Sequence, residues 1–545
     1  MNGIDWTSEV KRRQEALLRD LSSLLAIPSV KDEASAAPGM PLGIESAKAL
    51  AYMLELADRE GLRTANLEGI VGYAEYGGDG SGDSESGNPG KGEYANKGNG
   101  EKGHNDYIAV LSHVDVVPAS GEWTSPPYEP AIRDGRLYAR GALDDKGPAI
   151  AALYGLLIVK ELGLPLRHRI RIIIGTDEET GMNCMETYNR LERPPLAGFT
   201  PDADFPIVHA EKGQVNSRMT LRFADDSPPS AESEAELESK LESKSVSDQE
   251  RIYRLMSFTS GTAANMVPDF AEAVIQGSPT RLEALISDYR FFSATHELES
   301  ESMSDLASSS AHRVAILRMH GTSAHGMAPE TGNNAGMRLL TFLYGQSFEG
   351  DDQRFIKGAV ELLAGDTSGE ALGIACRDEA TGPLTVNVGL LRYDPLVREA
   401  YFHLNIRFPA CTNGETIVSM IESKIGEYGF VITPPIIKPP HQVAADHPMI
   451  KALQAIYRDH TGQEATLLST GGGTYACKLV NCVAFGPLFP GEFDTAHQQD
   501  ESISIDSLLK ATAMYAQAIF EMANLEYPAH EEGDELTWKS KSSKD

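Results

Sequence analysis

The chain has 545 residues, of which 41% are hydrophobic, and its formal net charge at pH 7 is −31. This length exceeds what one ordinary hydrophobic core supports, so we expect two or more domains. The strong negative charge argues against binding to nucleic acid or to an anionic membrane surface. The opening segment MNGIDWTSEVKRRQEALLRDL reads as a charged amphipathic helix rather than a signal peptide, and no run of about 18 apolar residues predicts a membrane span. The five cysteines form no Cys-x-x-Cys pair, which favours reduced thiols and a cytoplasmic location.

Hydrophobic periodicity predicts helices and strands in alternation along the first part of the chain. We expect helices at 7–25, 44–60 and 149–162, and strands at 69–76, 107–111, 169–174 and 207–210. Residues 77–103 contain ten glycines and almost no apolar side chain. Such a segment cannot bury enough surface to offset its ordering entropy, so we interpret it as a disordered insertion. A phosphate-binding loop is the weaker alternative, because no Lys-Ser/Thr pair and no helix follow it.

The second part of the chain predicts an inserted domain. Residues 225–250 are rich in Ser, Glu and Lys and indicate a solvated insert. Beyond them, strand and helix patterns alternate at 273–275, 281–292, 314–319, 334–344, 384–390 and 400–408. Further helices are expected at 415–428, 449–460 and 505–525, before a polar, flexible tail at 531–545. We therefore predict an α/β fold in which residues 1–212 and 409–530 form a mixed-sheet catalytic domain with flanking helices. Residues 213–408 would form an inserted α+β domain.

Candidate metal ligands fall at the predicted ends of these strands and at one helix start. His113 and Asp115 follow the strand at 107–111 and project to the same side, because they are two residues apart. Adjacent carboxylates at Glu178 and Glu179 follow the next strand, so one can bind a metal while the other faces a bound water. Asp144 precedes the helix at 149–162. The remaining candidates are Asp202, at a strand boundary, and His497, a distant imidazole.

These residues also have structural interpretations. A His-x-Asp pair at a strand end is ambiguous on its own, and Asp144 with Asp145 could simply cap the helix that follows. As a set, imidazoles mixed with carboxylates suit zinc, manganese or cobalt better than calcium, which prefers all-oxygen sites. Two divalent ions would balance three ligating carboxylates and a hydroxide, which suits a co-catalytic pair bridged by one carboxylate.

Nine motifs in this order make the chain similar to a known family. They are SHVDVVPA (112–119), YARGALDDKGP (138–148), GTDEETG (175–181), TPDADFP (200–206), GTAANMVP (261–268), GTSAHGMAP (321–329), NIRFP (405–409), GGGTYA (471–476) and DTAHQ (494–498). Together they resemble the acetylornithine deacetylase, succinyl-diaminopimelate desuccinylase and carboxypeptidase G family of metallopeptidases. Within it, they are most similar to the dipeptidase V-like, carnosinase-like branch.

The resemblance implies a role for each metal-site residue. His113, Asp144 and Asp202 would hold one metal, and Asp144, Glu179 and His497 the other, with Asp144 bridging. Asp115 would orient His113, and Glu178 would be the general base. The peptide bond after Asp144 would be cis. The cofactors implied are two divalent ions per chain, with zinc favoured over manganese or cobalt.

The resemblance also implies roles for residues of the inserted domain, which would act as a lid. His325 would donate to the developing oxyanion, and Asn265 would contact the same region. Arg407 would bind the substrate carboxylate, together with backbone N–H groups around Gly472, Gly473 and Thr474. Taken alone, Arg407 could be a surface ion-pair residue and His325 an ordinary loop histidine.

The expected activity is that of a metal-dependent dipeptidase acting on short, unblocked peptides. The branch that the chain resembles uses an enlarged lid to supply the oxyanion histidine, here His325, within one chain, so the resemblance implies a monomer. One alternative is an N-acyl-amino-acid deacylase or carboxypeptidase built on the same metals. A second alternative is a metal-binding protein without catalysis, which the presence of Glu178 argues against, since a binding protein needs no base.

Overall fold

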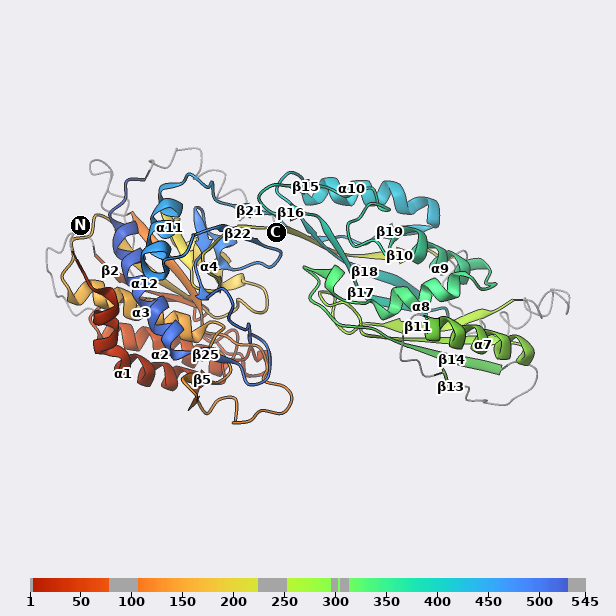
Figure 1. The fold of residues 1–545 in the computed structure, drawn as a ribbon, viewed down its shortest axis with the longest axis horizontal. Helices are drawn as coiled ribbons and strands as arrows, with labels where there is room; N and C mark the ends of the chain where they lie inside the picture. Colours follow the sequence, from red (N-terminus) through yellow and green to blue (C-terminus); the bar gives the residue numbers. More distant parts are fainter. Residues whose placement is uncertain (1–2, 78–105, 224–251, 296–301, 304–312, 528–545) are drawn as a thin grey trace. The chain divides into compact units, whose positions relative to one another are not determined.

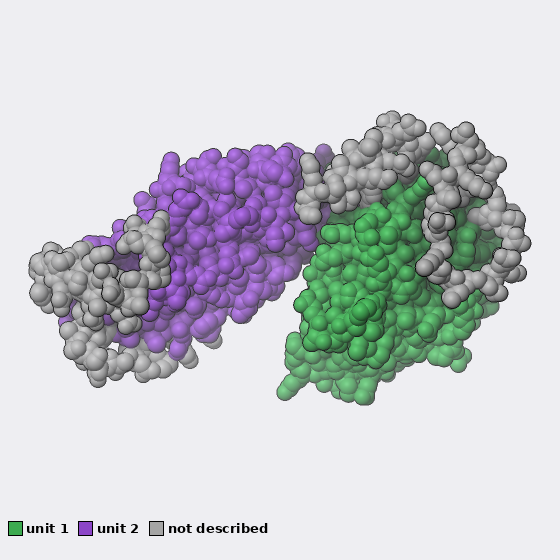
Figure 2. Space-filling model, turned by 180° about the vertical axis from the view of Figure 1, so that it is seen from behind, with its two compact units in different colours: residues 1–210, 442–469, 473–545 green, residues 211–441, 470–472 purple. Residues whose placement is uncertain are grey.

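The computed structural model describes residues 3–77, 106–223, 252–295, 302–303 and 313–527. The insertions expected at 77–103 and 225–250 lie outside these residues, apart from Gly77, and so does the expected tail at 531–545. The chain divides into two compact units, shown in different colours in Figure 2. Unit 1 comprises residues 1–210, 442–469 and 473–545, and unit 2 comprises residues 211–441 and 470–472. Unit 2 is therefore an insertion into unit 1.

A mixed β-sheet forms the centre of unit 1 (Figure 1). Its strands are β1 (Arg63–Leu67), β2 (Val71–Tyr76), β3 (Tyr107–His113), β6 (Arg169–Gly175), β7 (Ala197–Thr200), β9 (Ile207–Glu211), β21 (His441–Gln442), β22 (Leu467–Thr470) and β23 (Cys482–Ala484). The order along the sheet is β1-β2-β6-β3-β7-β23-β9-β21, and β22 also pairs with β9. Strands β6, β3, β7 and β23 run parallel to one another, so their carboxyl ends meet at one edge. Open α/β sheets place their sites at that edge.

Helices cover both faces of this sheet. They are α1 (Trp6–Leu25), α2 (Ile44–Arg59), α3 (Lys146–Glu161), α4 (Asn183–Leu191), α11 (Pro448–Thr461) and α12 (Ile505–Ala523). Alternate residues of β3 divide between two cores: Ile108 and Val110 pack with α1, α3 and α12, whereas Ala109 and Leu111 pack with α4. The central helix α3 is buried nearly all round, which explains why its sequence is apolar on every side.

Two small sheets extend unit 1 beside the central sheet. Strand β5 (Arg136–Tyr138) pairs with both β4 (Ala131–Arg133) and β25 (Ser502–Ser504), each time antiparallel. Strand β8 (Ala203–Asp204) pairs with β24 (Pro487–Leu488) in parallel. These pairings join segments that are far apart in the sequence. The β25–β5 pairing in particular brings the segment around His497 to the loop that precedes α3.

Unit 2 is an antiparallel sheet with helices packed on it (Figure 1). Its strands run in the order β13 (Ser302–Met303), β14 (Arg313–His320), β12 (Phe270–Gly277), β11 (Arg254–Ser260), β17 (Thr385–Asp394), β18 (Glu399–Phe408), β10 (Gly213–Leu221) and β19 (Phe430–Ile432). Strand β20 (Ile436–Lys438) also pairs with β10. The helices are α7 (Pro279–Thr295), α8 (Ala335–Tyr344), α9 (Gly350–Leu362) and α10 (Gly414–Ile425). Strand β12 alternates between buried and partly exposed residues, the pattern of a sheet with one face on a core.

The expected fold class is confirmed, and the expected helices and strands lie within a few residues of the observed ones. Hydrophobic periodicity did not predict several elements, among them α4, α9, β1, β7, β10, β11 and β19. Unit 2 extends to residue 441, whereas the expected lid ended at 408. The difference arises because α10 packs on β10 and β19 of unit 2 through Ile417, Ile421 and Ile425. None of the helices within the described residues combines the length and apolar character that crossing a bilayer requires.

Candidate metal centre

The parallel register of β3 and β6 brings two of the predicted motifs to one edge of the sheet. His113 ends β3 and is the register partner of Gly175, which ends β6. The Val114 N–H donates to the Gly175 carbonyl at 3.0 Å and extends this pairing by one residue. Glu178 and Glu179 lie in the turn that follows Gly175. The sheet therefore positions the imidazole and both carboxylates from neighbouring strand ends.

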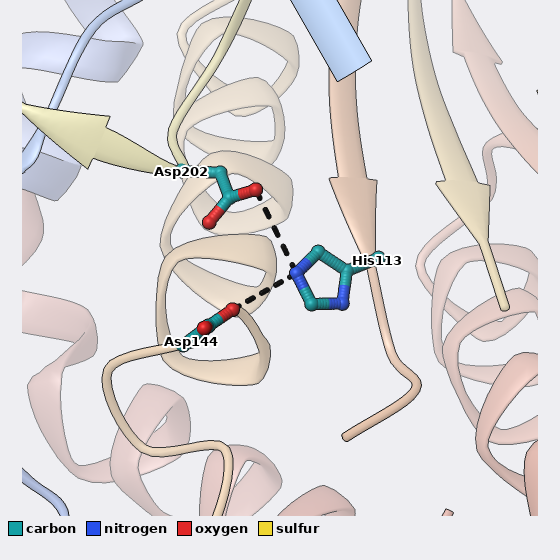
Figure 3. Close-up of side chains that lie close together, drawn as sticks. All are labelled: His113, Asp144 and Asp202. Atoms are coloured by element: carbon teal, nitrogen blue, oxygen red, sulfur yellow. Dashed lines mark hydrogen bonds and ion pairs between the residues drawn. The ribbon is translucent and has the colours of Figure 1, made fainter. Parts of the chain in front are cut away.

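Three side chains converge on this edge in Figure 3. His113 Nε2 lies 3.0 Å from Asp144 Oδ1 and 3.7 Å from Asp202 Oδ2. Asp202 follows β7, and Asp144 belongs to the loop before α3. In Figure 3 both carboxylates face the same nitrogen of the imidazole. We call His113, Asp144 and Asp202 the first donor group.

The second carboxylate oxygen of Asp144 belongs to another cluster. His497 Nε2 lies 3.0 Å from Asp144 Oδ2 and 3.1 Å from Glu179 Oε2. His497 has a positive φ of 62° and a half-exposed side chain, whereas Glu179 is largely buried. We call Asp144, Glu179 and His497 the second donor group. The two groups share Asp144, and each of its oxygens faces a different imidazole.

The donor groups fit divalent metal ions. Bonds of about 2.0–2.2 Å at tetrahedral angles place ligand atoms about 3.4 Å apart. The closest donor pairs, at 3.0, 3.7, 3.0 and 3.1 Å, lie around that spacing. Imidazole nitrogen mixed with carboxylate oxygen is a donor set that zinc, manganese and cobalt accept readily. The peptide bond between Asp144 and Asp145 is cis, as the resemblance implied.

Two carboxylates outside the donor groups support their backbone. The hydrogen bond of His113 Nδ1 is to the Asp115 backbone carbonyl at 3.1 Å, and Asp115 Oδ1 lies 3.4 Å from the same nitrogen. Asp115 Oδ2 accepts the Glu179 N–H at 3.1 Å. Asp145 Oδ2 accepts the His113 N–H at 3.0 Å. Asp145 is the N-cap residue of α3, but its side chain makes no capping hydrogen bond there, so the capping interpretation is wrong for this side chain. The sequence analysis gave Asp145 no role at the site.

Tyr475 is a buried neighbour of His113 that was not predicted from the sequence. Its ring packs edge-on against the His113 imidazole, with ring centroids 6.1 Å apart. Its hydroxyl lies 2.8 Å from the Cys184 sulfur. The ring approaches β6 so closely that a side chain at Gly175 would collide with it. The position of Tyr475 inside the GGGTYA motif was the available signal, since only the residues before it were interpreted.

Three carboxylates of the site, Glu178, Glu179 and Asp202, hold their protons more tightly than usual. Burial alone would raise the pKa of Asp144 too, but its hydrogen bonds to both imidazoles lower it. Burial raises the pKa of Glu178 well above its ordinary value, and repulsion from the Asp202 carboxylate adds to the effect. Burial and the neighbouring Asp144 raise the pKa values of Asp202 and Glu179 in the same way. This concentration of negative charge in a partly buried place favours cations.

The pKa values of the two imidazoles are raised as well, because the neighbouring carboxylates stabilise the protonated, cationic rings. Burial alone would lower the pKa of His113, but hydrogen bonds to Asp115 and Asp144 raise it above its ordinary value. Hydrogen bonds to Asp144 and Glu179 raise the pKa of His497 to about 11. A metal ion must displace these protons to bind, so metal binding and proton release are coupled.

The predicted lid residues gather within unit 2. The Gly326 N–H donates to the Asn265 carbonyl at 2.7 Å, and Met266 forms an isolated β-bridge with His325. The Cα of Gly326 also lies so close to Asn405 that a side chain there would press on its amide oxygen. Asn265 and His325 themselves are exposed. The two loops of unit 2 that carry Asn265 and His325 therefore lie next to each other.

Arg407 lies at the end of β18 and is 5% exposed. Its Nε donates to Asn405 Oδ1 at 3.2 Å, and its Nη1 donates to the Gly471 carbonyl at 2.8 Å. Burial lowers the pKa of Arg407 to about 10. These bonds hold the guanidinium in a fixed orientation. The interpretation of Arg407 as a surface ion-pair residue is therefore wrong.

Backbone N–H groups around Gly472, Gly473 and Thr474 were expected to bind the substrate carboxylate. The structure differs from this expectation at Gly472. The Gly472 N–H donates to Thr470 Oγ1 at 2.9 Å, so it already has an acceptor within the chain. Thr474 is buried, and its hydroxyl accepts the Ala476 N–H at the start of a 3-10 turn. Gly472 belongs to unit 2, whereas Gly473 and Thr474 belong to unit 1.

Comparisons with known proteins show to which family the chain is related. The model of peptidase family M20/M25/M40 matches residues 109–521. The Bacillus subtilis protein "Putative dipeptidase YtjP" is 42% identical over 95% of this chain and 100% of its own length. A Staphylococcus aureus protein, "Putative dipeptidase SAB1611c", is 34% identical over 95% of this chain and 99% of its own length.

Solved structures share the fold at low sequence identity. Human carnosine dipeptidase 1 gives a TM-score of 0.51 at 16% identity, with 95% of this chain and 98% of that chain covered. The aminoacylhistidine dipeptidase of Vibrio alginolyticus gives a TM-score of 0.51 at 13% identity, with 94% and 97% covered. The family match and the identity to full-length relatives confirm the resemblance found in the motifs: this chain belongs to the M20/M25/M40 family and is a metallopeptidase.

Proposed function

We propose that this chain is a dipeptidase that hydrolyses short peptides with free termini at a pair of divalent metal ions. The observation that carries the proposal is the shared carboxylate of Asp144, with one oxygen in each donor group. The names of the relatives, which call them dipeptidases, support the choice of substrate. Zinc is the metal we favour, with manganese or cobalt as alternatives. The monomeric state and the cytoplasmic location stay predictions.

In the proposed reaction Glu178 moves the proton. Two divalent ions bound by the donor groups would polarise the scissile carbonyl and acidify water. A Glu178 carboxylate oxygen accepts a proton from the attacking water and then donates it to the amide nitrogen that leaves as an amine. Its raised pKa makes it a stronger base than an ordinary glutamate. Asp115 keeps His113 and Glu179 in position during these transfers.

Residues of unit 2 would bind two parts of the substrate, the scissile carbonyl group and the terminal carboxylate. His325 donates a hydrogen bond to the oxygen that becomes negative during attack, and Asn265 contacts the same region. Arg407 binds the terminal carboxylate of the substrate through its fixed guanidinium. The backbone N–H groups of Gly472, Gly473 and Thr474 stay predicted contacts of a substrate carboxylate, and that of Gly472 would first have to leave Thr470 Oγ1.

A substrate panel tests the proposal. We expect turnover of unblocked dipeptides such as β-alanyl-histidine and little turnover of the same peptides after N-acetylation. Turnover of acetyl-amino acids without dipeptides would favour the deacylase alternative, and release of single residues from long peptides would favour a carboxypeptidase. No turnover at full metal content would favour a metal-binding protein without catalysis.

Metal analysis should distinguish residues that bind the metal ions from residues that only support those ligands. His113→Ala removes a first-group donor, so we expect fewer than two ions per chain by elemental analysis. Asp115→Asn leaves every donor in place, and we expect it to lose about 10–100-fold in rate while retaining most of its metal. His209→Ala, a buried histidine of the same unit that bonds the Val443 carbonyl, is the control and should keep both ions. Full metal content in His113→Ala would contradict the assignment.

Replacing the proposed base should separate chemistry from metal binding. Glu178→Gln keeps the size of the side chain but cannot accept the proton, so we expect kcat to fall by at least about 100-fold. Metal content should stay at the wild-type value. Glu186→Gln, on the exposed side of the nearby helix α4, should leave both quantities unchanged. Retained turnover in Glu178→Gln would exclude the proposed mechanism.

Substrates with and without a free carboxylate should reveal the role of Arg407. Wild-type protein should prefer a dipeptide to its C-terminal amide. In Arg407→Met we expect KM for the free dipeptide to rise about 10–100-fold, the size of a lost charged hydrogen bond, and this preference to disappear. Arg318→Met, which removes an arginine paired with Glu272 in the same unit, is the control. A preference that survives Arg407→Met would show that another group binds the carboxylate.

A further inference from the structure

Glu501 is a completely buried carboxylate that the proposed reaction does not use. Its Oε2 accepts hydrogen bonds from Arg140 Nη1 at 2.6 Å and from the Gly141 N–H at 3.0 Å. Its Oε1 accepts from the Leu143 N–H at 2.9 Å and from the Asp144 N–H at 3.1 Å. A carboxylate offers about four acceptor positions, and these bonds fill them. Glu501 therefore has no oxygen left for a metal ion.

Backbone pairing brings Glu501 to this loop. Strand β25 begins at Ser502, whose register partner on β5 is Tyr138. The pairing continues for one more residue, because the Ala139 N–H donates to the Glu501 carbonyl at 3.1 Å. The side chain of Glu501 then reaches under the turn that follows β5. Gly141 lies in this turn with a φ of 86°, a backbone conformation that favours glycine.

Glu501 is linked to both segments that supply the second donor group, the segment of His497 and the loop of Asp144. Glu501 follows His497 by four residues in the sequence, so both belong to one short segment. It also binds the N–H of Asp144, the residue that the donor groups share. The Asp144 side chain and His497 Nε2 are 3.0 Å apart, and this contact depends on both segments staying in register.

We propose that Glu501 is a positioning residue of the metal centre, which holds the Asp144 loop against the His497 segment. The inference rests on the metal centre of the proposed function. The backbone N–H of each of three ligand residues then has its own supporting carboxylate: Asp145 for His113, Asp115 for Glu179 and Glu501 for Asp144. Arg140 supplies the positive charge that balances the buried Glu501.

Glu501→Gln is the informative substitution. It preserves size and shape but replaces one acceptor oxygen with an NH₂ group that only donates. One pair of N–H groups, either at Arg140 and Gly141 or at Leu143 and Asp144, must then face another donor. The loop shifts, and the Asp144 oxygens lose their places in the donor groups.

The test measures zinc affinity of the metal-free full chain by competition with a chromophoric chelator. We expect Glu501→Gln to weaken binding of at least one of two zinc ions by about 10–100-fold, the usual effect of losing a group that supports a ligand. Glu75→Gln is the matched control, because Glu75 is 4% exposed and pairs with Arg171 at 2.9 Å in the same unit. Thermal unfolding of both metal-free variants measures their loss of stability, and Glu75→Gln should keep wild-type zinc affinity.

The outcomes separate the positioning role from the metal centre. Wild-type zinc affinity in Glu501→Gln, or an equal loss in Glu75→Gln, would overturn the positioning role alone. A wild-type chain that binds neither zinc nor manganese nor cobalt would overturn the metal centre and the positioning role together. If Glu501→Gln does not fold, Glu501→Asp is measured in the same way, since it keeps the charge but withdraws the carboxylate by one methylene.

Discussion

The Asp144 carboxylate is the constraint on which the rest of unit 1 depends, because its two oxygens face two different imidazoles. A shared ligand requires both donor groups to form around one side chain, with errors well below the length of a bond. Segments as distant as His113 and His497 must therefore meet at the same carboxylate. The parallel pairing of β3 with β6 positions His113, and the antiparallel pairing of β25 with β5 positions the segment that contains His497.

Further carboxylates surround the donor groups, and the cost of burying their charge explains why they are hydrogen-bonded or paired. Asp115, Asp145 and Glu501 are buried carboxylates, and burying a charge is costly unless it is bonded or paired. Each accepts at least one backbone N–H, and Glu501 also pairs with Arg140. The repulsion that remains between these carboxylates and those of the donor groups is a cost that divalent cations at the donor groups would offset. The arrangement is therefore better suited to the metal-bound protein than to the metal-free one.

The sequence predicted the parts of this site that follow from local pattern. Residues at the ends of parallel strands share an edge, so His113 and Glu179 could be placed together from hydrophobic periodicity alone. The motif order was needed for His497, which is more than 300 positions away. Glu501 and Asp145 could not be found in this way, because their roles depend on strand register and on a backbone N–H. The end of unit 2 was missed for a similar reason: an amphipathic helix such as α10 reveals its apolar face but not which sheet it covers.

Glu178 is the residue at which these opposing charges have their largest chemical effect. Burial and the carboxylates of Asp202 and Glu179 raise its pKa, whereas nearby cations would lower it again. A general base works best when its pKa lies near the working pH, far above the value of a free glutamate. Burial and neighbouring carboxylates favour the protonated form of Glu178, whereas bound cations would favour its carboxylate form, so the two influences oppose each other at this residue. The crowding of carboxylates around Asp144 therefore does more than bind metal, because it also sets the basicity of the one carboxylate that must exchange protons.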